Sequence, residues 1–530
     1  MPYARQYKYI SLLIVLIAYI WGAGQVQIPK IGDEVLYLQI ARVTGESPTL
    51  LPLKYEGGVL NTKPPLLYWL GIASTQVFGK SLFAYRLPVL LVTFLSAWVV
   101  FLLALSFLKN ETEAVWATTA YMGFISTFQH GRPFLVNSFE VLFLLLPLLF
   151  FYKRPRLNLL NWMVCALSWG AVSWSKSFAL IAVGCFSLTW ASFYLFETKW
   201  PKRLLFFGSA ALVSLCIFAL WFAFDPDPRL LFQQFIIGEN AVKFKGYSQY
   251  FSGLFMGSYT LFRIWLGPLA NAGLFTLPVV ALFILFFNKR KKILHADKAF
   301  LFFILAFLIF YSLPTQRQEN YLLPLMGVLA VLLAKYREVL SPTFWKVSIK
   351  LTDAIFILLS LAPVVLSLWG DMSFAAKFFW VLSIVAFPFL YFVWDAKNSY
   401  PLLVLLCFIQ LTNFSDPFNK KFDTFRVQSA ELWVPSRKLA QHERFRFIAP
   451  HSIPRSYLPG EEVSAKCEEL MPGEFIVVEE GDLAKCSRSY ETLETILDFK
   501  TRQTFAELLQ IARGKKEYLI RKLYLLKIKS

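Results

Sequence analysis

Charged residues are scarce in this sequence, at 16% of its 530 positions, while hydrophobic residues make up 57%. Soluble domains carry about 25% charged residues, so this composition excludes an ordinary set of globular domains. Histidine and cysteine are also few, at 4 and 6 residues, and they show no metal-ligand spacing. The glycines form no phosphate-binding loop, which argues against an ATP-driven pump and against direct use of a nucleotide sugar.

Long apolar runs dominate most of the sequence instead. A run of roughly 20 apolar residues can cross the hydrocarbon core of a bilayer as a helix. The basic residues that produce the net charge of +19 lie in short clusters between these runs, as they do in cytoplasmic loops. When each long apolar run between these clusters is assigned as a membrane span, the sequence predicts an α-helical polytopic membrane protein with about thirteen transmembrane helices. Their predicted ranges are 9–28, 83–108, 113–130, 135–152, 158–175, 178–196, 204–224, 262–287, 299–314, 321–335, 351–369, 374–394 and 399–413.

Two loops on the outer side of the membrane are too long to be simple connections, at residues 25–85 and 225–262. In the first loop, residues 33–43 and 66–77 carry apolar side chains at helical spacing. This pattern predicts two helices that lie on the membrane surface.

The composition changes near residue 414 to that of a soluble domain. An odd number of spans places this part outside, so we expect a membrane domain at 1–413 and a small outward α/β domain at 414–530. Cys467 and Cys486 both fall in this domain, where an oxidising compartment permits a disulfide, but the sequence leaves their pairing open. The predicted strands are 445–449, 475–478 and 518–526, and the predicted helix is 504–513.

Asp33 and Glu34 form an acidic pair just beyond the first span. A carboxylate at the interface can accept a proton from an acceptor group or hold a cation. Acids at a helix N-terminus are also stabilised by the helix dipole, by about 0.3–1 kcal/mol. From their spacing alone, the pair is better explained as a helix cap.

Lys63 precedes Pro64 and Pro65 in the same loop, and these prolines start the second surface helix. An ammonium group at the membrane surface suits a phosphate, particularly one on a lipid carrier. The commoner explanation for a single lysine at this depth is interfacial snorkelling.

The motifs of the first loop, in their order and spacing, resemble those of the bacterial lipid A aminoarabinose transferases and the related protein O-mannosyltransferases. The matching segments are 33–42, 63–69, Phe78-Gly79, Arg86-Leu87-Pro88 and 316–324. The resemblance implies a C-type glycosyltransferase fold, with a many-helix body and, in the aminoarabinose branch, a C-terminal periplasmic domain.

The resemblance also implies roles for particular residues. Asp33 matches the catalytic carboxylate of that family, with Glu34 beside it, and Lys63 matches the lysine that contacts the donor phosphate. Other polar residues are expected around the same cavity, because charge within a membrane normally faces one. We expect donor-phosphate contacts from Tyr37, Arg132, Arg317 and Tyr321, and a cavity lining of Asn137, Lys176, Glu239, Asn240 and Lys243.

The sequence departs from the family at several of these positions. Leu36 stands where the aminoarabinose transferases have an arginine, Thr62 where they have a glutamate, and Asn137 where relatives carry an aspartate. The family's histidine of the second loop is also absent near Glu239. These changes weaken the case for a divalent metal, and no other cofactor is implied beyond the lipid-linked sugar donor.

The sequence therefore predicts a multi-pass glycosyltransferase of the bacterial inner membrane, with its active site facing the periplasm. It would pass aminoarabinose, or a related pentose or hexose, from polyprenyl phosphate to lipid A or another lipopolysaccharide component. A protein acceptor, as in the O-mannosyltransferases, is the first alternative. A secondary transporter or lipid flippase is the second, but it predicts inverted repeats and broken helices that the sequence does not show.

Overall fold

The computed structural model describes most of the helical region and parts of the C-terminal region. The described residues are 2–25, 32–55, 58–244, 252–256, 259–288, 295–367, 372–421, 427–428, 431–432, 445–447, 471–473, 475–480, 483, 489–499 and 520–529.

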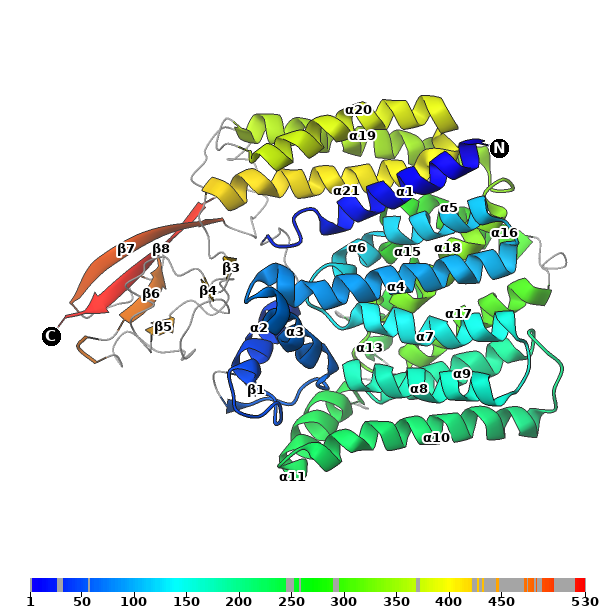
Figure 1. Ribbon diagram of the computed structural model, residues 1–530, viewed down its shortest axis with the longest axis horizontal. Helices are drawn as coiled ribbons and strands as arrows, with labels where there is room; N and C mark the ends of the chain where they lie inside the picture. Colours follow the sequence, from blue (N-terminus) through cyan, green and yellow to red (C-terminus); the bar gives the residue numbers. More distant parts are fainter. Residues whose placement is uncertain are drawn as a thin grey trace.

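The helices between residues 2 and 421 form one bundle, in which most helices run side by side in a common direction (Figure 1). Every range predicted as a transmembrane helix overlaps a helix of this bundle. The helices are α1 (Pro2–Ile20), α4 (Leu82–Leu108), α5 (Glu111–Gly123), α6 (Ile125–Gly131), α7 (Asn137–Lys153), α8 (Leu159–Ser175), α9 (Ala179–Ser192), α10 (Trp200–Phe224), α14 (Leu261–Trp265), α15 (Gly267–Ala272), α16 (Thr276–Asn288), α17 (His295–Ser312), α18 (Leu323–Tyr336), α19 (Pro342–Ser367), α20 (Phe374–Trp394) and α21 (Ala396–Lys421).

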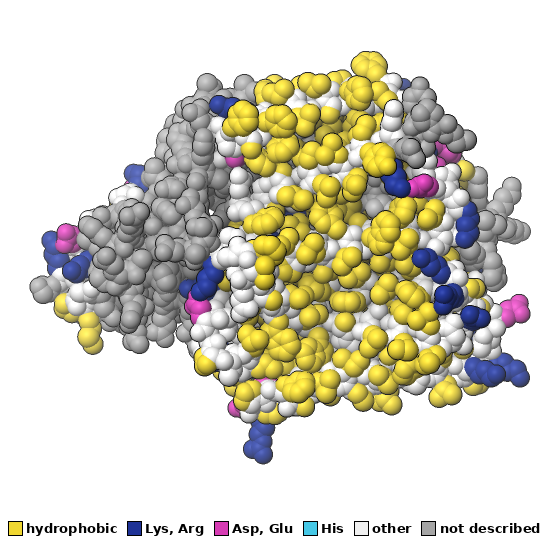
Figure 2. Space-filling view, in the orientation of Figure 1, with side chains coloured by type: hydrophobic (Ala, Val, Ile, Leu, Met, Phe, Trp, Pro, Cys, Tyr) yellow, Lys and Arg dark blue, Asp and Glu magenta, His cyan; other side chains and the backbone are white. Residues whose placement is uncertain are grey.

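Four helical segments of the described part are long and apolar enough to cross a membrane, judged by length and composition: Leu82–Leu108, Trp200–Phe224, Gly267–Asn288 and Phe374–Trp394. The face seen in Figure 2 carries a broad field of apolar side chains over the bundle, with lysines and arginines gathered along one edge. Exposed apolar surface of this extent is stable only against lipid or another apolar partner.

Two predicted spans are interrupted, and the interruptions meet. The span predicted at 113–130 divides into α5 and α6 at Phe124, which has an extended backbone. The span predicted at 262–287 bends between α15 and α16 at Gly273, whose φ of +60° favours glycine. A Cβ atom at Gly273 would lie 2.7 Å from Cβ of Ile125, so the close approach of the two breaks also requires glycine.

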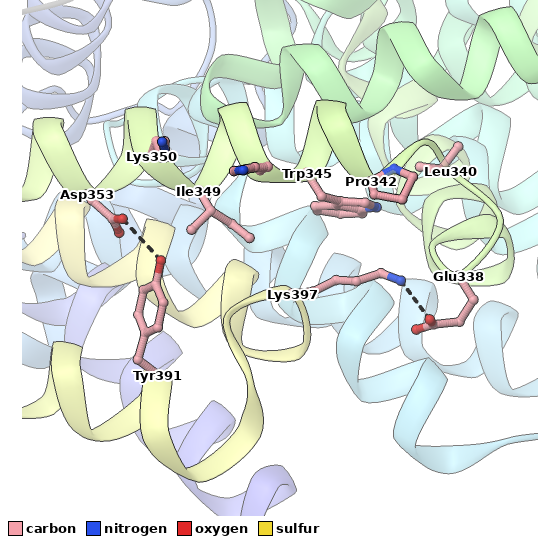
Figure 3. A pocket seen from close by; sticks show the side chains of 10 residues that line it. Glu338, Leu340, Pro342, Trp345, Ile349, Lys350, Asp353, Tyr391 and Lys397 are labelled. Carbon is pink, nitrogen blue, oxygen red and sulfur yellow. Dashed lines mark hydrogen bonds and ion pairs between the residues drawn. The ribbon is translucent and has the colours of Figure 1, made fainter.

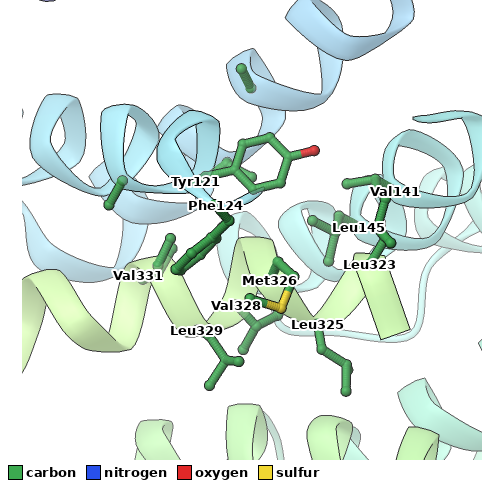
Figure 4. Close-up of a cluster of buried hydrophobic side chains, with 14 of the residues drawn as sticks. Tyr121, Phe124, Val141, Leu145, Leu323, Leu325, Met326, Val328, Leu329 and Val331 are labelled. Carbon is green, nitrogen blue, oxygen red and sulfur yellow. The ribbon is translucent and has the colours of Figure 1, made fainter. Parts of the chain in front are cut away.

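α18 is the centre of the hydrophobic core. Every residue from Leu323 to Ala334 is buried, as expected for a helix that is apolar on all sides. Figure 4 shows its side chains, including Met326 and Leu329, packed against Tyr121 and Phe124 of the α5–α6 region and Leu145 of α7.

The first long loop folds against one end of this bundle (Figure 1). It contains α2 (Gly32–Gly45), a small hairpin of β1 (Lys54–Tyr55) and β2 (Gly58–Val59), and α3 (Leu66–Phe78). The two helices coincide with the predicted surface helices. Their buried residues, among them Tyr37 and Tyr68, form a second core with Phe134, just before α7, and Phe139 in its first turn.

The second long loop begins where Asp225 ends α10 and Asp227 caps the next helix through its side chain. Its elements are α11 (Pro228–Leu231), the π-helix η1 (Phe232–Asn240), the 3-10 helix η2 (Ala241–Phe244) and α13 (Ser252–Phe255). A π-helix of this length is rare, and π-helical segments are frequent at functional sites.

The C-terminal region contains a four-stranded sheet in the order β5-β6-β8-β7, with β5 and β6 parallel and the other pairs antiparallel. Its strands are β5 (Phe445–Phe447), β6 (Phe475–Glu479), β7 (Tyr490–Phe499) and β8 (Ile520–Ile528), and β3 (Val427–Gln428) pairs separately with β4 (Glu431–Leu432). β7 was not predicted, and α21 continues past the predicted boundary at residue 413. The predicted helix at 504–513 and both Cys467 and Cys486 lie outside the described residues.

Candidate functional site

Asp33 and Glu34 begin α2, but their surroundings differ sharply. Asp33 is exposed, whereas Glu34 is 3% exposed. Adjacent residues on a helix point about 100° apart, so one can face the core while the other faces solvent. The pair therefore does not act as one unit.

Glu34 is an anchor between separate parts of the chain. Its carboxylate accepts hydrogen bonds from Arg86 Nε at 2.6 Å and Arg86 Nη2 at 2.8 Å, and from the backbone N–H of Phe134 at 2.7 Å. Arg86 Nη1 also donates to the carbonyl oxygens of Ala23 and Gln25, each at 2.8 Å. This buried bidentate pair joins the end of α1, the start of α2, α4 and the segment before α7.

Lys63 and Lys243 converge on one carboxylate of η1. The ammonium groups of both lysines bind the same oxygen, Oε1 of Glu239, and the Lys243 contact is 2.9 Å long. Burial acts to raise the pKa of Glu239, but the two ammonium groups outweigh it and hold that pKa below its ordinary value. Burial and then the charge of Lys63 lower the pKa of Lys243. Two cations around one anionic oxygen form a positive site that joins the two long loops.

A second ion pair lies between the start of α7 and the end of α8. Glu140, in the first turn of α7, is 0% exposed and accepts from Lys176 Nζ at 2.6 Å and from Asn137 Nδ2 at 3.2 Å. Lys176 also stands over the ring of Tyr321, 4.7 Å from its centroid. Sequence analysis missed Glu140, although an acid inside the apolar run of α7 is the kind of residue that marks a functional cavity.

Hydrogen bonds connect both ion pairs to the long loops. Ser177, next to Lys176, donates to Oδ1 of Asn240 at 2.9 Å, and Nδ2 of Asn240 donates to the carbonyl of Phe235 within η1 at 2.8 Å. The backbone N–H of Asn61 donates to Oε1 of Gln234 at 2.8 Å. The first loop, η1 and the end of α8 therefore hold one another in place.

Three tyrosines place Asp33 in the same neighbourhood. Burial raises the pKa of Tyr37, Tyr68 and Tyr321, and the negative charges of Asp33 and Glu239 raise each of them further. The rings of Tyr37 and Tyr68 meet edge to face, with centroids 5.9 Å apart. Asp33 thus shares its electrostatic surroundings with the lysine-bound carboxylate on η1.

Arg132 and Arg317 were expected to contact the donor phosphate, but their guanidinium N–H groups donate to backbone carbonyls. Arg132 is 1% exposed and binds the carbonyls of Tyr19, at 3.1 Å, and Trp21. Arg317 binds the carbonyls of Ser312 and Tyr259, at 3.0 and 3.1 Å. Both satisfy carbonyl groups at the ends of helices or in loops, which would otherwise be costly to bury.

The structure therefore groups most, but not all, of the predicted site residues. Within the described part of the chain, no three histidine, cysteine, aspartate or glutamate side chains are placed to hold a metal ion. The residues that lie together are Asp33, Tyr37, Lys63, Asn137, Lys176, Glu239, Asn240, Lys243 and Tyr321, joined by the unpredicted Tyr68 and Glu140.

Comparison with known sequences gives one family and several relatives. Residues 62–223 match the family described as dolichyl-phosphate-mannose-protein mannosyltransferase. An undecaprenyl phosphate-alpha-4-amino-4-deoxy-L-arabinose arabinosyl transferase of Proteus mirabilis is 25% identical over 377 residues, covering 67% of this chain and 65% of the relative. The corresponding Yersinia pestis protein is 27% identical over 326 residues, covering 57% of this chain and 54% of the relative. The matches thus span less than two thirds of each relative's length.

Two solved structures share the fold over nearly the whole chain. Crystal structures of ArnT from Cupriavidus metallidurans superpose with a TM-score of 0.64 in the apo state and 0.66 when bound to undecaprenyl phosphate. Each alignment covers 98% of this chain and 97% of the other, at 14% identity. At that identity the comparison shows a shared fold and carries no argument about function.

Proposed function

We propose that this chain, which is related in sequence and fold to the aminoarabinose transferases and protein mannosyltransferases, is a membrane glycosyltransferase. It takes a sugar from a polyprenyl-phosphate carrier and transfers it to lipid A or another lipopolysaccharide component. The reaction takes place at the end of the helical body that carries Asp33 and Lys63.

The observation that carries this proposal is the convergence of Lys63 and Lys243 on a single carboxylate oxygen. Each ammonium group is a compact cation that suits a phosphate oxygen. When the donor binds, its phosphate takes the position next to these two cations. Lys63 then stabilises the negative charge that grows on the phosphate as the sugar leaves.

Asp33 is the proposed catalytic carboxylate. Its exposure leaves it free to meet an acceptor, in contrast to Glu34, which is buried against Arg86. Asp33 acts as general base toward an acceptor hydroxyl, or orients a phosphate acceptor, while the acceptor oxygen attacks the anomeric carbon. The carbon–oxygen bond to polyprenyl phosphate breaks, and the phosphate keeps the bonding electrons.

The location follows from the charge of the loops. Basic clusters between the spans support a cytoplasmic position for the opposite end of the body, and the proposed site then faces the periplasm of an inner membrane. Residues 1–413 form the membrane domain, and residues 414–530 form a periplasmic domain that follows it.

The transferred sugar is aminoarabinose or a related pentose or hexose. The relatives are named for undecaprenyl phosphate-linked aminoarabinose, which supports an amino sugar. Leu36 and Thr62 replace charged residues that the resemblance leads one to expect, which supports a different sugar on the same carrier.

A protein acceptor is the second candidate. Residues 62–223, which match the protein mannosyltransferase family, include Lys63, Glu140 and Lys176. Mass spectrometry of glycolipids and of periplasmic proteins, from cells with and without this chain, would show which class loses a sugar.

The direct test supplies purified protein with polyprenyl-phosphate sugars and lipid A and measures released polyprenyl phosphate. We expect turnover by the wild type and a loss of about 10²–10⁴-fold in Asp33→Asn, the range expected for a general base. Equal turnover by both proteins would remove Asp33 from the mechanism. No turnover with any donor or acceptor would refute the proposed activity and favour a transporter.

A further inference from the structure

A second polar pocket lies at the basic end of the helical body, far along the bundle from Asp33. α19 begins here at Pro342, α20 ends at Trp394 and α21 begins at Ala396. At the other end of the bundle, Gln25 after α1 donates to Asp416 near the end of α21, at 3.3 Å. The pocket is therefore separate from the proposed catalytic site.

The pocket has a volume of about 450 Å³ and walls of mixed character. Figure 3 shows the Asp353–Tyr391 pair at one side and the Lys397–Glu338 pair at the other, with the apolar side chain of Ile349 between them. The indole of Trp345 and the leucine and proline of the α18–α19 connection complete the wall. A cavity of this size can hold a small polar headgroup.

Two lysines of the pocket have no acidic partner in the part of the chain that the structure describes. Lys346 and Lys350 are four residues apart on α19, so they lie on the same side of the helix, and both are exposed. Within the described residues neither forms an ion pair, whereas Lys397 binds Glu338 at 2.6 Å. Two ammonium groups one helical turn apart suit an anion with more than one oxygen.

Asp353 provides a hydrogen-bond acceptor in the same pocket, whereas the two lysines provide donors. It follows Lys350 by one helical turn, and the hydroxyl of Tyr391 donates to its Oδ2 at 3.1 Å. Its Oδ1 is buried, and among the described residues it accepts no hydrogen bond. A buried acceptor without a donor costs about 1–3 kcal/mol, so a ligand that brings an N–H or O–H group would be stabilised here.

The surroundings of the pocket suit a lipid. Val347 and Leu351 on α19 are 48% and 46% exposed, and Phe392 on α20 is 89% exposed. Trp345 and Tyr391 have the amphipathic rings that are enriched at the level of lipid headgroups. Acyl chains can therefore continue along the apolar helix surfaces from a headgroup in the pocket.

We propose that this pocket binds the headgroup of a phospholipid that carries both a phosphate and a hydrogen-bond donor. The phosphate oxygens accept from Lys346 and Lys350, and the donor of the headgroup binds Oδ1 of Asp353. Ethanolamine and glycerol headgroups share this chemistry through N–H and O–H groups. A choline headgroup has the phosphate but no donor.

The test is native mass spectrometry of the purified, delipidated full chain. It is titrated separately with phosphatidylethanolamine, phosphatidylglycerol and phosphatidylcholine that have identical acyl chains. We expect the first two to bind about tenfold more tightly than the third, which corresponds to one hydrogen bond to a charged group. Comparing the first two shows which headgroup is preferred, and either preference supports the site.

Matched variants locate the binding. Lys346→Gln with Lys350→Gln should weaken binding of phosphatidylethanolamine and phosphatidylglycerol about tenfold. Lys199→Gln with Lys202→Gln removes the same charge from exposed lysines at the start of α10 and should change neither. Asp353→Ala should abolish the preference over phosphatidylcholine. Equal binding of all three lipids to the wild type, or equal losses in the two double variants, would overturn the proposal.

Discussion

Replacing Glu34 by glutamine should destabilise the protein much more than replacing the neighbouring Asp33 by asparagine. Glu34 and Arg86 are each 3% exposed, and their carboxylate and guanidinium groups form two hydrogen bonds of 2.6 and 2.8 Å. A neutral amide leaves the buried guanidinium without its charge partner, which typically costs about 3–5 kcal/mol. It also weakens the acceptor of the Phe134 N–H group. Among the described residues the exposed Asp33 has no such partner to lose, so Asp33→Asn should change stability by less than about 1 kcal/mol.

The two variants form a matched pair, because each exchanges one carboxylate for an amide in the first turn of α2. The assay is thermal unfolding in detergent, followed by tryptophan fluorescence, alongside turnover of a polyprenyl-phosphate sugar measured well below the unfolding temperature. We expect Glu34→Gln to unfold at a clearly lower temperature, and Asp33→Asn to unfold with the wild type but to lose turnover. If Glu34→Gln matched the stability of the wild type and lost turnover, Glu34 would be a catalytic group and the anchoring role would be wrong.

Three further results are expected. Lys63→Met should reduce turnover by about 10²–10³-fold, as loss of a donor to developing charge does, whereas Lys80→Met, at an exposed ion pair with Glu46, should not. Glu239→Gln should tighten product inhibition by polyprenyl phosphate, because both lysines become available to the phosphate. It should lower stability by about 1 kcal/mol or less, since the group is partly exposed. The pKa of Glu239 in the folded protein lies below its ordinary value of 4.5. The difference in stability between the wild type and Glu239→Gln should therefore be complete above pH 4.5 and should disappear as the pH falls through the folded-state pKa. Gly273→Ala should destabilise the bundle by about 1–3 kcal/mol, measured by thermal unfolding, because its φ is +60° and a Cβ has no room.

Helix positions were well predicted where an apolar run coincided with a cap. α20 begins and ends at the predicted residues, and the hydroxyl of Ser373 caps its start by accepting from the backbone N–H of Ala376. α19 begins at Pro342, earlier than the predicted start at residue 351, and the exposed Lys346 and Lys350 lie on this additional part of the helix. The break at Phe124 could not be predicted, since it depends on Gly273, which is distant in the sequence.

The candidate site was predicted as a set of residues but not as a set of contacts. Lys63 and Glu239 were both selected, yet their pairing depends on how two loops meet and has no local signature. Arg132 was expected to contact phosphate because it is charged and near a helix end, but a buried guanidinium also suits main-chain carbonyls. Glu140 was not among the predicted residues, although it lies in the same first turn of α7 as Asn137 and accepts a hydrogen bond from it.

The contact between Lys63 and Glu239 has a consequence for the order in which the protein is made. The two residues are 176 positions apart, and α4 to α10 lie between them in the sequence. At a synthesis rate of about 5–20 residues per second, Glu239 is added roughly 9–35 s after Lys63. During that interval Lys63 lacks the carboxylate that it binds in the finished protein. The site therefore forms late in membrane insertion, and a fragment that stops before η1 would keep the anchored acid of the first loop but lack the phosphate-binding pair.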